Sequence, residues 1–172
     1  RLCCHCLSMP VFWNNRAMKR IMFVCHGNIC RSPMAEFIMK ELVRKAFASD
    51  GFHIESSATS REEVGNPIYR PAAYTLSMHD IECEGHRARQ ITLDDYNNCD
   101  MVIVMEDYNL RNLERIIGRD REKVWKLLDF VESEPRQLCG GDISDPWYHG
   151  NFDKTYNEIM AGCRGLLRYL GY

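Results

Sequence analysis

The chain alternates between short runs of consecutive apolar residues and longer stretches in which apolar residues recur every three or four positions. The runs at 19–25, 52–59, 100–105 and 124–128 predict strands. Helical spacing predicts helices over 32–48, 71–79, 108–117 and 153–170, and a short one around 94–96. Residues 129–150 are rich in Gly, Pro and Asp and are expected to be irregular.

Strands that alternate with helices indicate an α/β fold built on a parallel sheet. The run Asp-Met-Val-Ile-Val-Met at 100–105 is typical of a strand that is covered on both faces. We expect one domain over 18–172, because residues 1–17 precede the first strand and read as an N-terminal extension that packs poorly. Parallel sheets bind ligands at the carboxyl ends of their strands, and Cys25 lies at such an end.

Composition narrows the function classes. The net charge of −2 argues against a nucleic-acid partner, which would call for a basic surface. No apolar run reaches the roughly 18 residues of a membrane span. Nine cysteines without a recognisable signal peptide favour reduced thiols and a cytoplasmic location. Cys3, Cys4, His5 and Cys6 fit no common zinc spacing, so no metal or other cofactor is expected.

The strongest chemical signal is a loop that begins with Cys25 and ends with Arg31, between the first strand and the first helix. The spacing alone means little, since Cys83 and Arg89 repeat it by accident. Cys83, however, lies between two glutamates and follows no apolar strand. Cys25 does follow an apolar strand, and the loop after it contains Gly27 and Asn28, which tolerate the unusual backbone angles of a tight loop.

Such a loop suits a phosphate dianion and a negative sulfur. Its backbone N–H groups can form an anion nest, and the following helix directs its N-terminus at the same point. Arg31 can hold two phosphate oxygens at once, and the Ser32 hydroxyl can donate to a Cys25 thiolate. We therefore expect Cys25 to attack phosphorus and form a phosphocysteine, with no metal required.

The departing ester oxygen needs a proton, and the irregular segment and its flank offer four carboxylates: Asp129, Asp142, Asp145 and Asp153. Asp145 is favoured modestly over Asp142, because Pro146 restricts the backbone beside it.

Six motifs stand in order between about residue 18 and residue 172: Val24-Cys25-His26-Gly27-Asn28-Ile29-Cys30-Arg31-Ser32-Pro33, Ser56-Ser57-Ala58-Thr59-Ser60, Gly65-Asn66-Pro67, His86-Arg87-Ala88-Arg89, Met105-Glu106-Asp107-Tyr108-Asn109-Leu110 and Asp145-Pro146-Trp147-Tyr148. Through these motifs the chain resembles the low-molecular-weight protein tyrosine phosphatases. The resemblance implies a three-layer fold with a four-stranded parallel sheet flanked by helices.

The resemblance also implies roles for individual residues. Cys25 would be the nucleophile, Arg31 the phosphate ligand and Asp145 the general acid and base. The substrate-binding set would be His26, Gly27, Asn28, Ile29, Cys30, Ser32, Trp147 and Tyr148, with Ser56 and His86 supporting the loop. Cys30 would protect Cys25 through a reversible disulfide. The implied partner is a phosphotyrosine-containing protein or peptide, acted on by a monomer or weak homodimer.

Some positions depart from the family pattern, and related activities stay open. Arg61, Glu62 and Glu63 stand where an aromatic residue is frequent, and Glu106 stands where aspartate is common. Protein arginine phosphatases are similar but carry threonine in place of Ile29. Arsenate reductases need two further cysteines at close spacing, which Cys83 and Cys99 do not provide. A non-catalytic phosphate-binding module is a further alternative.

Overall fold

A computed structural model describes residues 18–131 and 139–172. The expected extension at 1–17, with its cluster of cysteines and one histidine at positions 3–6, lies outside the described residues. Within the described residues no group of three or more His, Cys, Asp or Glu side chains could hold a metal ion. Nor is any helix in these two ranges both long enough and apolar enough to cross a membrane.

A four-stranded sheet forms the centre of the fold, in the order β2-β1-β3-β4. Its strands are β1 (Lys19–Cys25), β2 (Phe52–Ala58), β3 (Met101–Val104) and β4 (Val124–Lys126). Every neighbouring pair runs parallel. The predicted parallel α/β architecture is therefore confirmed.

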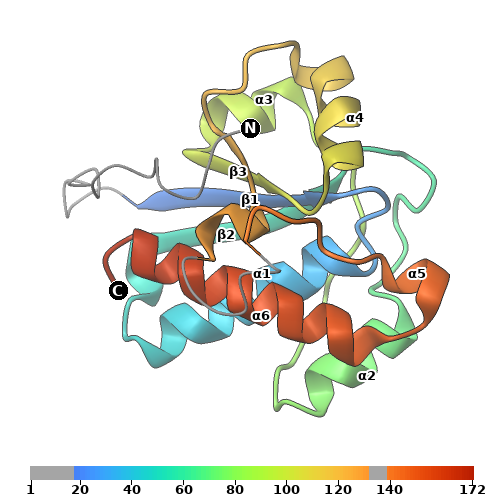
Figure 1. Ribbon diagram of the computed structural model, residues 1–172, viewed down its shortest axis with the longest axis vertical. Coiled ribbons are helices and arrows are strands. Elements are labelled where there is room, and N and C mark those ends of the chain that lie inside the picture. The colour runs from blue at the N-terminus through green and yellow to red at the C-terminus, as the bar shows by residue number, and fades with distance from the viewer. Residues whose placement is uncertain (1–17, 132–138) are drawn as a thin grey trace.

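Helices cover both faces of the sheet (Figure 1). One face carries α1 (Arg31–Lys45), α2 (Arg70–Ser77) and α6 (Phe152–Tyr169), and the other carries α3 (Leu93–Asn98) and α4 (Asp107–Ile117). Successive residues of a strand point to opposite faces. Ile21 and Phe23 accordingly join one buried cluster, and Met22 and Val24 join the other. Two cores thus fix β1 in the middle of three layers.

The first helix is shorter than the apolar spacing predicted. It ends at Lys45 rather than near position 48, and a short 3₁₀ turn (Ser49–Gly51) follows it. The Ala48 N–H bonds back to the Val43 carbonyl, and Phe47 between them takes a φ of 54°. This left-handed turn directs Phe47 out of the core, so that its side chain is 99% exposed although its position fits the apolar stripe.

The segment expected to be irregular contains more local structure than predicted. A 3₁₀ turn (Leu127–Phe130) ends the last strand at Lys126, because the Asp129 carboxylate accepts the Lys126 N–H at 3.0 Å. Further on, the short helix α5 (Pro146–His149) is capped by the Asp145 side chain. Both turns depend on one aspartate each, which a search for apolar periodicity does not detect.

Most of the described cysteines are free thiols: Cys25, Cys30, Cys83, Cys99 and Cys163. Cys139 is disulfide-bonded, which differs from the expectation that the thiols are reduced throughout.

Candidate functional site

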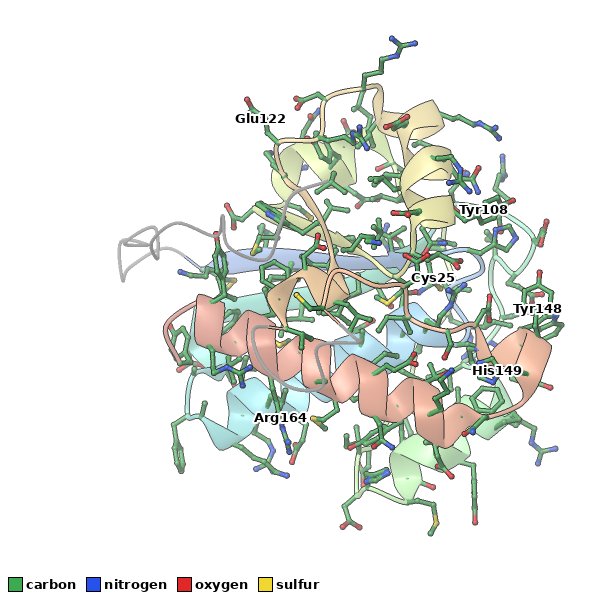
Figure 2. The ribbon with its side chains drawn as sticks, viewed as in Figure 1. Cys25, Tyr108, Glu122, Tyr148, His149 and Arg164 are labelled. Carbon is green, nitrogen blue, oxygen red and sulfur yellow. The ribbon has the colours of Figure 1, made fainter. Side chains whose placement is uncertain are left out.

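The loop from Cys25 to Arg31 leaves the carboxyl end of β1 and leads into α1, where Figure 2 labels Cys25. The Cys25 side chain is 3% exposed. Its sulfur lies 3.1 Å from the Ser32 hydroxyl and accepts the Asn28 N–H at 3.3 Å. The Asn28 N–H therefore points at the sulfur, and the Ser32 hydroxyl, which also donates to the Ser57 carbonyl at 3.2 Å, can act as donor or acceptor toward it.

Asn28 holds the loop in a strained shape. Its φ is 60°, which an asparagine tolerates better than most residues, and its side chain is fully buried. The amide group donates to the hydroxyls of Ser32 and Ser56, each at 2.9 Å, and accepts the Arg89 N–H at 3.1 Å. The side chain of Asn28 thereby ties the loop to α1, β2 and the segment before α3.

A second layer of contacts lies behind Asn28. His86 Nε2 is 2.8 Å from the Asn28 carbonyl oxygen, and the Ser56 hydroxyl donates to Glu36 at 2.5 Å. The structure thus brings together the two predicted supporting residues, Ser56 and His86. Glu36 was missed in the sequence, although it stands four residues after Ser32 and so faces the same side of α1.

Arg31 is almost completely buried and is held by three oxygen atoms. It donates to the Ile143 carbonyl at 3.2 Å and to Asp145 at 2.6 Å, and its ion pair with Glu106 measures 2.9 Å. Burial opposes the charge of the guanidinium, but the neighbouring Cys25 sulfur and the two carboxylates outweigh it and raise the pKa of Arg31. Glu106 therefore occupies a supporting position although it replaces the more common aspartate.

The residues before Asp145 are anchored one by one. The Ile143 N–H bonds to the Met105 carbonyl, and both the N–H and the hydroxyl of Ser144 donate to Glu158 at 2.8 Å. Asp145 itself uses one oxygen to cap α5 through the Trp147 N–H at 3.0 Å and the other to accept from Arg31. Its carboxylate is consequently fixed beside the loop.

The other three candidate acids lie elsewhere. Asp142 forms an ion pair with Lys126 at 2.9 Å, and Asp129 binds the Lys126 N–H. Asp153 is an exposed residue of the first turn of α6. Of the four carboxylates weighed from the sequence, the structure places Asp145 against Arg31.

A pocket with a cavity volume of about 160 Å³ opens above the loop. Its lining residues are Cys25, His26, Gly27, Ile29, Cys30, Arg31, Glu62, Glu63, Asp145, Trp147 and Tyr148. The side chains of Asn28 and Ser32 lie outside this lining and hold the loop from behind. Trp147 and Tyr148 are exposed, and Tyr69 packs against Trp147 with ring centroids 5.3 Å apart.

Three other cysteines, Cys30, Cys83 and Cys99, differ from Cys25 in their surroundings. Burial raises the pKa of the Cys30 thiol above its usual value, and the Cys25 sulfur adds to this. Burial, and then Glu84, raise the pKa of Cys83, which agrees with interpreting its spacing to Arg89 as accidental. Cys83 packs against one core cluster and Cys99 belongs to the other, on opposite faces of the sheet. A disulfide cascade through both is therefore not supported.

Comparisons with known proteins agree with this geometry. A family model described as low molecular weight phosphotyrosine protein phosphatase matches residues 20–171. The Bacillus subtilis low molecular weight protein-tyrosine-phosphatase YfkJ is 34% identical over 151 residues, which cover 87% of this chain and 94% of that protein. The human low molecular weight phosphotyrosine protein phosphatase is 35% identical, over 88% and 96% of the two chains.

Solved structures are similar too. The crystal structure of YfkJ has a TM-score of 0.83 at 33% identity and covers 90% of this chain and 96% of that one. A Drosophila arginine phosphatase has a TM-score of 0.77 at 26% identity, over 90% and 99% of the two chains. With a family model that matches almost every described residue and relatives above 30% identity over most of their length, the chain belongs to the low molecular weight phosphotyrosine protein phosphatase family.

Proposed function

We propose that this protein hydrolyses phosphotyrosine in proteins or peptides through a phosphocysteine intermediate. Cys25 is the nucleophile, Arg31 the phosphate ligand and Asp145 the general acid and base. The observation that carries the proposal is that these three side chains line one pocket, with Arg31 in direct contact with Asp145 at 2.6 Å.

Phosphate binding follows from the loop and the helix after it. Helix α1 begins at Arg31, and among the described residues no side chain caps its N-terminus. The N–H groups at the start of this helix are therefore available to an anion, and the helix dipole favours negative charge there. The Arg31 fork can hold two phosphate oxygens, which replace part of its contact with Asp145. Once Arg31 no longer donates to Asp145, one oxygen of the Asp145 carboxyl group is free to give a proton to the leaving group.

The reaction then takes two steps. The Cys25 thiolate attacks phosphorus, the P–O bond to the tyrosine ring breaks, and Asp145 supplies the proton that the departing phenolate needs. Asp145 next removes a proton from water, which attacks phosphorus and releases inorganic phosphate from sulfur. Ser32, at 3.1 Å from the sulfur, stabilises the thiolate both before the attack and as it leaves.

The pocket walls favour an aromatic ester. Ile29, Trp147 and Tyr148 line the pocket and offer apolar or aromatic surface to a phenyl ring. Phosphoarginine is the second candidate substrate, because a similar solved structure is an arginine phosphatase and because Glu62 and Glu63 also line the pocket. A guanidinium group would be attracted to those carboxylates.

An aryl phosphate assay in the presence of a metal chelator tests the proposal. Wild type should hydrolyse the ester, and Cys25→Ser should lose the activity but still bind phosphate. Asp145→Asn is the sharper acid variant, because asparagine can also cap α5 while it cannot donate the proton. General acid catalysis contributes about 10²- to 10⁴-fold, so Asp145→Asn should lose rate on that scale. Asp153→Asn, on an exposed aspartate, is the matched control.

A wild type without phosphatase activity under these conditions would refute the proposal. Normal activity in Cys25→Ser would refute the assigned nucleophile. Peptides that differ only in carrying phosphotyrosine or phosphoarginine then decide between the two substrates, and a higher kcat/KM for phosphoarginine would reverse the proposed preference.

We also propose a cellular location and an oligomeric state for the enzyme. The free thiols Cys25, Cys30, Cys83, Cys99 and Cys163 favour a reducing, cytoplasmic compartment, whereas the disulfide-bonded Cys139 does not. Light scattering after size exclusion should find a monomer or a weak homodimer, and a stable higher oligomer would contradict this part.

A further inference from the structure

The described lining of the pocket holds more carboxylates than cationic side chains. Glu62, Glu63 and Asp145 contribute three carboxylates, whereas Arg31 is the one lining residue with a permanent positive charge among those the structure describes. Arg31 is 2% exposed and already pairs with Glu106 and Asp145. Its charge is therefore directed to the bottom of the pocket, and the Glu62–Glu63 side of the pocket has no comparable cation among the described lining residues.

Glu63 is held in place beside the loop. A Cβ placed on Gly27 would lie 3.3 Å from Glu63 Cγ, which shows that the stem of Glu63 packs directly over this glycine. The Glu63 carboxylate accepts a hydrogen bond from the Asn66 side chain at 2.6 Å. Burial is the main cause that raises the pKa of Cys30, and the negative charge of Glu63 adds a small part. The carboxylate is thus held at the wall of the pocket above the loop.

Glu62 is ordered in a similar way. Its carboxylate lies 3.0 Å from His26 Nε2, and its side chain remains 71% exposed. The segment that carries both glutamates is fastened to the loop, since the Ser60 N–H bonds to the His26 carbonyl at 3.0 Å. Two carboxylates on a fastened segment therefore face the approaching substrate from one side.

We infer that Glu62 and Glu63 select phosphotyrosine whose neighbouring residues are Lys or Arg. This inference rests on the proposed function and narrows its substrate class. A cationic neighbour pairs with the two carboxylates and offsets their repulsion of the phosphate, whereas an acidic neighbour adds to that repulsion. Exposed ion pairs contribute little each, so two of them should change kcat/KM by about five- to tenfold between a lysine and a glutamate neighbour.

Three phosphotyrosine peptides test the inference, identical except for Lys, Gln or Glu on both sides of the phosphotyrosine. Wild type should prefer them in that order at low salt. The Lys-to-Glu ratio should fall below about twofold in about 0.5 M NaCl, where exposed charges are screened. The variants Glu62→Gln and Glu63→Gln should each lower the ratio, and the double variant should abolish it while it still hydrolyses the Gln peptide.

Glu122→Gln is the matched control, because Glu122 is an exposed glutamate on the side of the molecule away from Cys25 and Tyr148 (Figure 2). It should leave the ratio unchanged. Equal hydrolysis of the three peptides by wild type, or an unchanged ratio in the double variant, would overturn the inference and leave the phosphatase function intact. Failure to hydrolyse any of them would instead count against the proposed function itself.

Discussion

Replacing Asn28 by alanine should destabilise the protein and disable the loop together. The change removes two donated hydrogen bonds, to Ser32 and Ser56, and one accepted from the Arg89 N–H. At about 1 kcal/mol net for each, these contribute roughly 3 kcal/mol. Alanine at a φ of 60° adds about 1 kcal/mol of backbone strain. The expected loss is therefore about 4 kcal/mol, a large share of the roughly 5–15 kcal/mol that keeps a domain folded.

Urea unfolding followed by tryptophan fluorescence measures this loss of stability. An aryl phosphate assay measures whether the loop still supports catalysis. Asn28→Gly separates the two causes, because glycine accepts the backbone angle but makes none of the side-chain bonds, so it should retain about 1 kcal/mol more than alanine. Asn98→Ala, on an exposed residue at the end of α3, is the control and should change little. An Asn28→Ala variant that unfolds at the wild-type urea concentration and keeps its activity within about twofold would contradict both expected losses.

Three further predictions concern packing, redox chemistry and pH. Gly165→Ala should destabilise by about 2 kcal/mol or more, because its Cβ would lie 2.1 Å from the Phe130 carbonyl oxygen, whereas Gly162→Ala meets only the Leu127 side chain, which can move, and should cost less in the same urea titration. Peroxide should inactivate the enzyme by oxidising Cys25 to a sulfenic acid, which the Cys30 thiol converts to a disulfide with release of water; a thiol reductant should then restore activity in wild type, and equal recovery in Cys30→Ser would contradict this. Burial raises the pKa of Cys99 from 9.0 to about 11, so the thiol ionises at a lower pH in the unfolded chain than in the folded protein. The free energy of unfolding should therefore fall as the pH rises between these two pKa values. Cys99→Ala should lose less stability than wild type between about pH 8 and 10.5, and an identical loss would rule out this cause.

Much of the fold could be predicted from local pattern, and the failures have identifiable causes. The strands at 19–25 and 101–104 were predictable because residues covered on both faces must be continuously apolar. The end of α1 could not be predicted in this way, because Phe47 keeps the helical spacing while a left-handed turn carries it into solvent. The turn at α5 was missed because it consists of four residues and depends on one capping carboxylate.

The sequence by itself determined where the loop lies and which residues it offers for chemistry, since a cysteine, a tight turn and an arginine between a strand and a helix are local features. It favoured Asp145 over Asp142 as the acid only modestly, because the two aspartates lie three residues apart in a segment without periodicity. Only the tertiary structure shows which of the two aspartates lies against Arg31. Contacts across more than a hundred residues place Asp145 on Arg31, while Lys126 takes Asp142. The same folding brought Glu62 and Glu63 over the loop, because their position depends on how the segment after β2 packs against it and not on any motif of their own.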